Sequence, residues 1–260
     1  MPYKYADRII AFIDILGFSE KIKITDNKDK PEEAREMLTN LSSAVRFFQK
    51  KIKEAIEDIL LPAGTIASMF SDTIVVSIPK DESGGALYLF ELLKELQINL
   101  LFKNILLRGG IVHGKLIHTE QLIIGPALVS AHDLESKSAL YPRIVIDPRV
   151  LFLYVRQNGE PVKSLRLGDY EFHLTYAKDF DGTSYIDYFN SVEEYVPMKD
   201  SSAYFAEMNK IIRKGTARSQ RDIGIRMKYM WMKEKLSIAN YSDEVKYPEE
   251  TKTITPRKKS

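Results

Sequence analysis

Two aspartates stand at positions where a carboxylate needs a partner. Asp14 follows the apolar residues Ile9 to Ile13 within the segment 8–18, and Asp72 lies between two β-rich segments, 65–70 and 73–78. Each one alone is explained by an aspartate that stabilises a turn. As a pair at adjacent strand ends, however, they would repel each other unless a cation lay between them. Mg²⁺ and Mn²⁺ take such oxygen ligands and usually bind phosphate as well.

A glycine-rich strand supplies the third feature, Arg108-Gly109-Gly110-Ile111-Val112-His113-Gly114. Glycines inside an apolar strand usually mark a close approach of the backbone to another element. Arg108 at the entrance of this strand is interpreted as a bidentate phosphate ligand, with a surface ion pair as the alternative. His113 is interpreted as a hydrogen-bonded packing residue.

The elements that must position these residues follow from periodicity and breaker residues. The apolar run predicts a central strand that is buried on both faces, and residues 19–30 are expected to form a loop. The sequence then predicts a helix over 31–59, a hairpin turning at Ser71-Asp72, a helix capped by Ser83, strands at 105–113 and 116–124, a helix over 126–139 and a strand at 143–146. The order through residue 124 predicts an α/β (α+β) fold with a ferredoxin-like βαββαβ core.

The remainder of the chain predicts a strand-and-helix extension. A short helix near 148–155, strands near 165–176 and 183–189, and a long amphipathic helix over 201–236, interrupted near Gly215, are expected. The expected domains are a catalytic core over 1–150, a C-terminal extension over 151–240 and a disordered tail over 241–260.

Composition excludes several classes of protein. Lys and Arg number 38 against 36 Asp and Glu, a net charge of +2 that argues against a dedicated nucleic-acid binder. The absence of cysteine excludes a zinc finger, an iron–sulfur cluster and a cysteine nucleophile. No apolar stretch is long enough to span a membrane and no signal peptide is recognised, so a cytoplasmic protein is expected.

A local excess of basic residues remains in the long helix. It is interpreted as a solvated face, with attraction of a triphosphate or of a nucleic acid as the alternatives. These residues are Lys210, Arg213, Lys214, Arg218, Arg221, Arg226 and Lys228.

Taken in order, these motifs resemble the catalytic domain of class III nucleotidyl cyclases. The resemblance covers roughly residues 8–147. Its first-strand motif Asp-Ile-x-Gly-Phe is met by Asp14 to Phe18, and its second metal-binding aspartate by Asp72. The motif Arg-x-Gly-Ile-x-x-Gly and the following glycine and Leu-Glu are met by Arg108, Gly110, Ile111, Gly114, Gly125, Leu134 and Glu135.

This resemblance implies a head-to-tail homodimer with active sites at the interface and a nucleoside triphosphate as substrate. Asp14, Asp72 and the carbonyl of Ile15 would bind two ions, Mn²⁺ or Mg²⁺, and Arg108 would hold the terminal phosphates. Attack of the 3′-hydroxyl on the α-phosphorus would then form a 3′,5′-cyclic nucleotide and expel pyrophosphate. Backbone amides that would bind phosphate are those of Leu16, Gly17, Phe18 and Ser19.

The chain departs from the family at the base-reading and transition-state positions. Ser68 and Leu122 fall where the family reads adenine or guanine, and neither purine code is present. Val129 and Asp133 fall where the family has its transition-state Asn and Arg. Possible substitutes are Ser130, His132, Arg213, Arg218 and Arg221.

A narrower resemblance is to the bacterial pyrimidine cyclases of Pycsar antiphage systems. It rests on Asp14 to Phe18, Phe70 to Asp72, Arg108 to Ile111, Gly125 to Ala127 and Leu134 to Ser136. It implies conversion of UTP or CTP to cUMP or cCMP, a product that acts on a separate cyclic-nucleotide effector in antiviral defence. A catalytically degenerate module that binds a nucleotide or a partner, and a purine cyclase, are the alternatives, and uracil is not distinguished from cytosine.

Overall fold

The computed structural model of the chain describes residues 3–57, 61–80, 85–154, 156–157, 160–161, 164–167, 170–173, 176–190, 192, 195 and 198–245. Its first elements are β1 (Ala6–Ile15), α1 (Phe18–Thr25), α2 (Pro31–Glu57), β2 (Ile66–Phe70), β3 (Thr73–Pro79), α3 (Gly85–Leu101), β4 (Leu107–His118), β5 (Ile123–Ile124), α4 (Pro126–Ser138), β6 (Ile144–Ile146) and α5 (Pro148–Tyr154). The later ones are β7 (Arg156–Gln157), β8 (Glu160–Pro161), β9 (Ser164–Leu167), β10 (Tyr170–His173), β11 (Tyr176–Lys178), β12 (Ser184–Ile186), α6 (Met198–Arg218) and α7 (Ile223–Val245).

The main sheet has the strand order of a split βαβ core. Its path is β11-β12-β6-β4-β1-β3-β2, with β1 antiparallel to both β3 and β4. Since α2 joins β1 to β2 and α3 joins β3 to β4, the stretch β4-β1-β3-β2 is the predicted ferredoxin-like βαββαβ core, and the α+β prediction is confirmed. Beyond β4 the sheet continues with β6, which is parallel to it, and then with β12 and β11.

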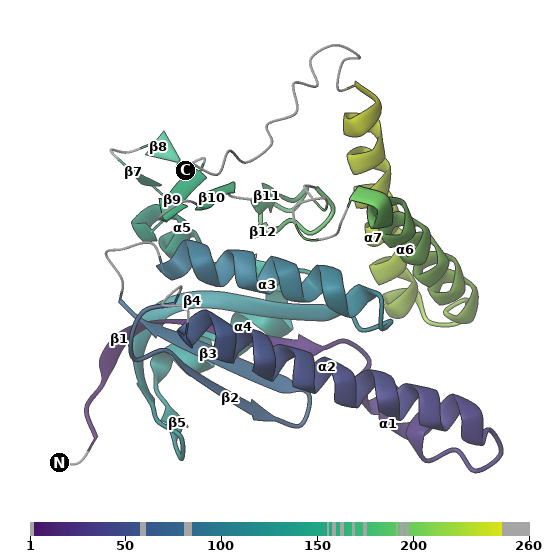
Figure 1. Cartoon of the computed structure of the whole chain (residues 1–260), viewed down its shortest axis with the longest axis horizontal. Coiled ribbons are helices and arrows are strands. Elements are labelled where there is room, and N and C mark those ends of the chain that lie inside the picture. Colours follow the sequence, from purple (N-terminus) through teal and green to yellow (C-terminus); the bar gives the residue numbers. More distant parts are fainter. Residues whose placement is uncertain are drawn as a thin grey trace, which may run out of the picture.

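Each face of β1 is buried in a different apolar cluster. Ile9 and Ile13 pack in the cluster beneath α2 and α3, whereas Ile10 and Phe12 pack in the cluster beneath α4. Figure 1 shows α2 and α3 in front of the sheet and α4 behind it. Burial of an isoleucine of this kind contributes about 1.5 to 3 kcal/mol, so β1 is a rigid support for the residues that follow it.

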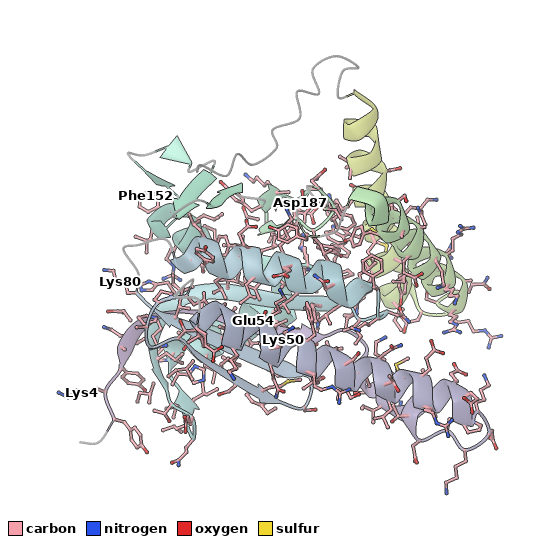
Figure 2. The ribbon with its side chains drawn as sticks, viewed as in Figure 1. Lys4, Lys50, Glu54, Lys80, Phe152 and Asp187 are labelled. Carbon is pink, nitrogen blue, oxygen red and sulfur yellow. The ribbon has the colours of Figure 1, made fainter. Side chains whose placement is uncertain are left out.

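The outer face of α2 is polar, as its amphipathic pattern predicted. Pro31 begins the helix and Glu32 and Glu33 stand in its first turn, where acidic side chains stabilise a helix. On the exposed side, Lys50 and Glu54 lie one turn apart with 3.5 Å between their charged atoms (Figure 2). The helix thus presents its apolar face to the core and its charged face to solvent.

The extension packs against the end of α3 through a third apolar cluster. Ile98 and Leu101 of α3 meet Tyr185 of β12, Tyr204 of α6 and Trp231 of α7 in this cluster. Because α3 contacts both this cluster and the main core, it is apolar nearly all round. Among the described residues, no helix is long and apolar enough to cross a membrane.

Several local predictions are wrong. The strands predicted at 105–113 and 116–124 are replaced by one strand, β4 (Leu107–His118), and the short β5 (Ile123–Ile124), and the strand predicted near 165–176 is divided among β9, β10 and β11. Residues 18–25 form helix α1 instead of a loop, because Phe18 packs against the main core and Gly17, at φ 71°, turns the chain out of β1. The helical break lies between Arg218 and Ile223 and not at Gly215. Gly215 lies inside α6. A Cβ at this position would overlap the ring of Tyr229 on α7, so the absence of a side chain permits close packing of the two helices.

Some predicted features involve residues that the structure does not describe. The expected cap at Ser83 and the tail residues 246–260 lie outside the described residues. Residues 241–245, predicted to be disordered, continue α7. The division into a core of residues 1–150 and an extension stays a prediction.

Candidate active site

Strand register brings the three predicted catalytic residues to one end of the central sheet. Asp14 of β1 lies opposite Thr73 of β3 on one side and opposite Arg108 of β4 on the other. Asp72 immediately precedes Thr73, and its carbonyl accepts a bond of 3.2 Å from the N–H of Ile15. Asp14, Asp72 and Arg108 therefore meet beside α4, and the approach of Asp14 to Asp72 is the one that the predicted strand order indicates.

Arg108 is the cationic centre of this group. Its Nε lies 3.0 Å from Oδ2 of Asp14 and 2.7 Å from Oε1 of Glu135 on α4. Only the contact to Asp14 has hydrogen-bond geometry, so Oε1 of Glu135 is buried without a hydrogen bond among the described residues. One guanidinium group thus faces two carboxylates, one of which it satisfies only through charge.

The pKa values of Asp14 and Glu135 are both raised. Burial is the main cause of the raised pKa of Asp14, and the carboxylate of Asp72 raises it further, while the bond from Arg108 opposes both effects. Burial also raises the pKa of Glu135, with Arg108 lowering it and Asp14 raising it. Since Asp14, Asp72 and Glu135 are three carboxylates around the guanidinium of Arg108, negative charge is in excess at this site, which favours a cation.

Two residues in the left-handed region shape this end of the sheet. Ser71 has φ 59°, a conformation that costs a non-glycine residue energy and that directs Asp72 at the hairpin turn. Gly17 has φ 71° and leads from β1 into α1. Beyond it, the first helical amides, those of Phe18 and Ser19, have no acceptor within the helix and point out of its N-terminus.

The predicted phosphate-binding amides are only partly available. The N–H of Leu16 already donates to the carbonyl of Leu106 at 2.9 Å. The amides of Gly17, Phe18 and Ser19 stay candidates for phosphate binding. The side chain of Ile15 is buried in the main core, which leaves its carbonyl as the group to consider for a metal.

The close backbone approach predicted from the glycines is confirmed at Gly110. A Cβ at this position would lie 2.8 Å from the carbonyl of Ala131 and 3.0 Å from Cβ of Leu134, both on α4. Glycine thus lets α4 lie directly on β4. This close packing is what brings Glu135 to Arg108.

The predicted base-reading residue Ser68 belongs to a buried polar network. Arg8 Nε donates to Oγ of Ser77 at 2.8 Å, and Oγ of Ser77 lies 2.7 Å from Nδ1 of His118. Nε2 of His118 lies 3.0 Å from Oγ of Ser68. A neutral His118 ring donates to one of these two serines and accepts from the other, and Ser77 also accepts from Arg8.

This network gives a prediction for the pH dependence of stability. Burial and the charge of Arg8 lower the pKa of His118 to about 4, from an ordinary value of 6.5. Between those values the unfolded chain binds a proton that the folded chain excludes, so the free energy of unfolding falls as pH falls from 6.5 to 4. The slope from this group is at most about 1.4 kcal/mol per pH unit. Urea unfolding at pH 7, 6 and 5 should show a shallower decline for His118→Gln than for the natural chain, and equal declines would contradict this account.

Leu122 lies in the connection between β4 and β5, and Val129 lies on α4. Leu122 stands in the turn between β4 and β5, where its carbonyl accepts from the N–H of Thr119 at 2.8 Å. Val129 is 63% exposed on α4. The contact between His118 and Ser68 links the end of β4 to β2.

Sequence reasoning gave Glu135 no chemical role. In the sequence Glu135 is only the second residue of a Leu-Glu pair, and its spacing from Arg108 does not indicate an ion pair. A buried acid on the helix that follows an arginine strand is the pattern that would have identified it.

The protein groups at this site supply only some of the ligands that a divalent cation needs. Asp14, Asp72 and the Ile15 carbonyl offer hard oxygen ligands, which suit Mg²⁺ or Mn²⁺. In the part of the chain that the structure describes, no group of three or more His, Asp or Glu side chains is arranged to hold a metal. An ion at the paired aspartates would therefore take its other ligands from water or phosphate.

Comparison with known proteins finds resemblance in solved structures alone. No protein-family model matches the chain, and no curated protein matches it. The adenylyl cyclase CyaB from P. aeruginosa has 16% identity and a TM-score of 0.41, over 58% of this chain and 81% of that one. An adenylate/guanylate cyclase/hydrolase from Silicibacter pomeroyi has 17% identity and a TM-score of 0.42, over 71% and 99%. The catalytic core of a rhodopsin-guanylyl cyclase with converted specificity has 14% identity and a TM-score of 0.44, over 70% and 94%. At these values the likeness assigns neither reaction nor substrate.

Proposed function

We propose that this chain is a nucleotidyl cyclase that converts a nucleoside triphosphate to a 3′,5′-cyclic nucleotide and pyrophosphate. The observation that carries the proposal is the pair Asp14 and Asp72 beside Arg108 at the end of β1. Two carboxylates held together suit divalent ions, and an adjacent guanidinium suits phosphate. Phosphoryl transfer needs such positioning and charge neutralisation and little else from side chains.

In this reaction the 3′-oxygen of the ribose forms a bond to the α-phosphorus, and the bond from that phosphorus to the bridging oxygen breaks. Pyrophosphate leaves, and the hydroxyl proton passes to solvent. Bound Mn²⁺ or Mg²⁺ would lower the pKa of the 3′-hydroxyl and neutralise phosphate charge. Asp14, Asp72 and the Ile15 carbonyl would hold the ions, Arg108 would pair with a phosphate, and Glu135 would keep Arg108 in place.

We further propose that the chain acts as a homodimer with active sites at the interface. Three exposed apolar side chains support this: Phe70 and Ile124, each 50% exposed, and Val129, 63% exposed. By strand register, Phe70 lies opposite Thr73 and Thr73 opposite Asp14, so Phe70 belongs to the same side of the sheet as the site. A second copy would cover these side chains and bring Ser68 and Leu122 to the nucleotide.

The favoured substrates are UTP and CTP, and the product is a signal to a separate effector in antiphage defence. Ser68 and Leu122 supply neither of the purine-reading pairs. The hydroxyl of Ser68 lies 3.0 Å from Nε2 of His118 and can act as a donor or an acceptor toward a pyrimidine ring. This assignment rests on the resemblance to pyrimidine cyclases, and adenylate or guanylate cyclisation is the alternative outcome.

The test is incubation of the purified chain with each of the four NTPs and Mn²⁺, followed by product identification by mass. The proposal expects one NTP to yield a product lighter by pyrophosphate, and the pyrimidine assignment expects that NTP to be UTP or CTP. A product from ATP or GTP alone would keep the reaction and overturn the substrate. Absence of any cyclic product, with extracts of infected cells added, would overturn the reaction.

A second candidate is a cyclase-fold module that binds a nucleotide or a partner without turnover. Val129 and Asp133, in the places of the family's transition-state Asn and Arg, are the observation that favours it. This candidate expects nucleotide affinity, or a stable partner, that survives Asp72→Asn. The cyclase expects metal-dependent affinity for the nucleotide to fall in that variant.

A further inference from the structure

One residue of the extension reaches the neighbourhood of the candidate site. Lys228 lies on α7, about 210 residues along the chain from Asp14. It belongs to the basic stretch that is interpreted from the sequence as a solvated face. Its flanking residue Met227 is 48% exposed, but Lys228 itself is half-buried. A lysine that is half-buried among basic neighbours needs a reason for its position.

Two contacts fix the place of α7 relative to the site. Trp231 stacks on Tyr141 with ring centroids 5.5 Å apart, and Tyr141 follows the end of α4, the helix that carries Glu135. Leu16, two residues after Asp14, packs against the apolar cluster that contains Trp231. Lys228 precedes Trp231 by three residues and so shares its face of the helix.

Buried charges hold α7 in this position. Asp179, in the turn between β11 and β12, accepts from Nε1 of Trp231 at 2.7 Å and pairs with Lys235 at 2.7 Å, and it also pairs with the fully buried Arg143. Although burial alone would raise the pKa of Asp179, bonds from Lys235, Phe180 and Trp231 keep it below its usual value. The segment that contains Lys228 is thus attached to the core through Trp231 and Lys235, which lie one and two turns later in the helix.

The charges around Lys228 are those of the candidate site. Burial lowers the pKa of Lys228, and the charge of Arg108 lowers it further, while the carboxylates of Asp222, Asp14 and Glu135 raise it. No ion pair within the described residues joins Lys228 to any of these carboxylates. Its ammonium group lies in the field of the site without being committed to one partner.

We propose that Lys228 is a phosphate-binding residue of the Asp14–Asp72–Arg108 site, supplied by α7 of the same chain. This inference rests on the proposed function, since it takes a polyphosphate as the ligand. Arg108 is shared between Asp14 and Glu135, so it brings little uncommitted positive charge to a triphosphate. Lys228 adds one positive charge, and it gives the extension a role in the site that the βαββαβ core alone lacks.

The test uses inorganic tripolyphosphate with Mn²⁺ as the probe, measured by titration calorimetry on the full chain at fixed salt. Lys228→Met removes the charge and keeps the length of a half-buried side chain. We expect it to weaken tripolyphosphate binding about tenfold, and Lys228→Arg to restore most of the affinity. Lys233→Met, an exposed lysine on the same helix, should bind within about twofold of the natural chain.

The outcomes separate this inference from the proposed reaction. If Lys228→Met melts at the natural temperature and binds tripolyphosphate with unchanged Kd, or if the natural chain does not bind it, the inference is wrong. If binding depends on Lys228 but no NTP is cyclised, the inference stands and the proposed reaction fails. If NTPs are cyclised with the same KM by Lys228→Met, the reaction stands and the inference fails.

Discussion

Asp72→Asn is expected to reduce formation of cyclic nucleotide by at least about 100-fold while leaving the fold intact. Asparagine keeps the shape of the side chain at the hairpin turn, but it removes one of the two charges that would hold a divalent ion. The same change takes away the like charge that raises the pKa of Asp14. The thermal midpoint should therefore stay unchanged or rise, since a source of repulsion is lost.

The matched control for this variant is Asp7→Asn. Asp7 lies near the other end of β1 and pairs with Lys115 at 2.8 Å on the exposed surface. Losing that exposed pair should leave stability nearly unchanged, because solvent screens it, and should not change the rate of turnover. Mass-resolved product formation with Mn²⁺ and a thermal melt measure both quantities. Turnover by Asp72→Asn at the natural rate would mean that the paired carboxylates do not carry the reaction.

The approach of Asp14 and Asp72 was predictable because it follows from strand order. An apolar run, a two-residue hairpin turn and a split βαβ pattern together place a strand end beside a turn. Strand pairing then determines which residues face each other, since side chains alternate along each strand. Arg108 was predictable for the same reason, because the glycines that follow it identify the neighbouring strand.

The partners of these residues were not predictable, because they come from elements whose placement depends on packing. Glu135 meets Arg108 only because Gly110 allows α4 to lie on β4. The segment of α7 that carries Lys228 is placed by Trp231 and Lys235, which bond to Asp179, more than 40 residues earlier in the chain. Periodicity identifies a helix and its apolar face, but it does not say which strand that face will cover.

Two of the wrong local predictions have the same origin. Residues 19–30 are rich in Lys and Asp, a composition that favours a loop, whereas the partly buried Phe18 packs against the main core at the start of α1. Gly215 was interpreted as a helix breaker, whereas the ring of Tyr229 occupies the space that a side chain would fill. In both places a tertiary contact determines the structure, and local composition does not.

Arg108→Met is expected to lower both turnover and stability. In the absence of nucleotide, Asp14 and Glu135 lose the one cation that they share, and two partly buried carboxylates are left to repel each other. We expect a loss of about 2 kcal/mol in the free energy of unfolding at pH 7, which is less than for a fully buried pair because Arg108 is 26% exposed. Turnover should fall by about 100-fold or more, since the guanidinium is the only arginine group at the carboxylates among the described residues.

The pH dependence of that loss distinguishes electrostatic repulsion from lost packing. The pKa values of Asp14 and Glu135 are raised in the folded chain, from 3.8 and 4.5, and removal of Arg108 raises them further. A group of this kind binds its proton more readily when folded, so the folded chain gains stability relative to the unfolded chain as pH falls through the raised value. The deficit of Arg108→Met should therefore be largest at pH 7 and shrink toward pH 4.5, and Glu135→Gln in the same chain should recover part of it. Urea unfolding at both pH values measures this, and a deficit that is independent of pH and of Glu135 would mean that Arg108 stabilises the site by packing alone.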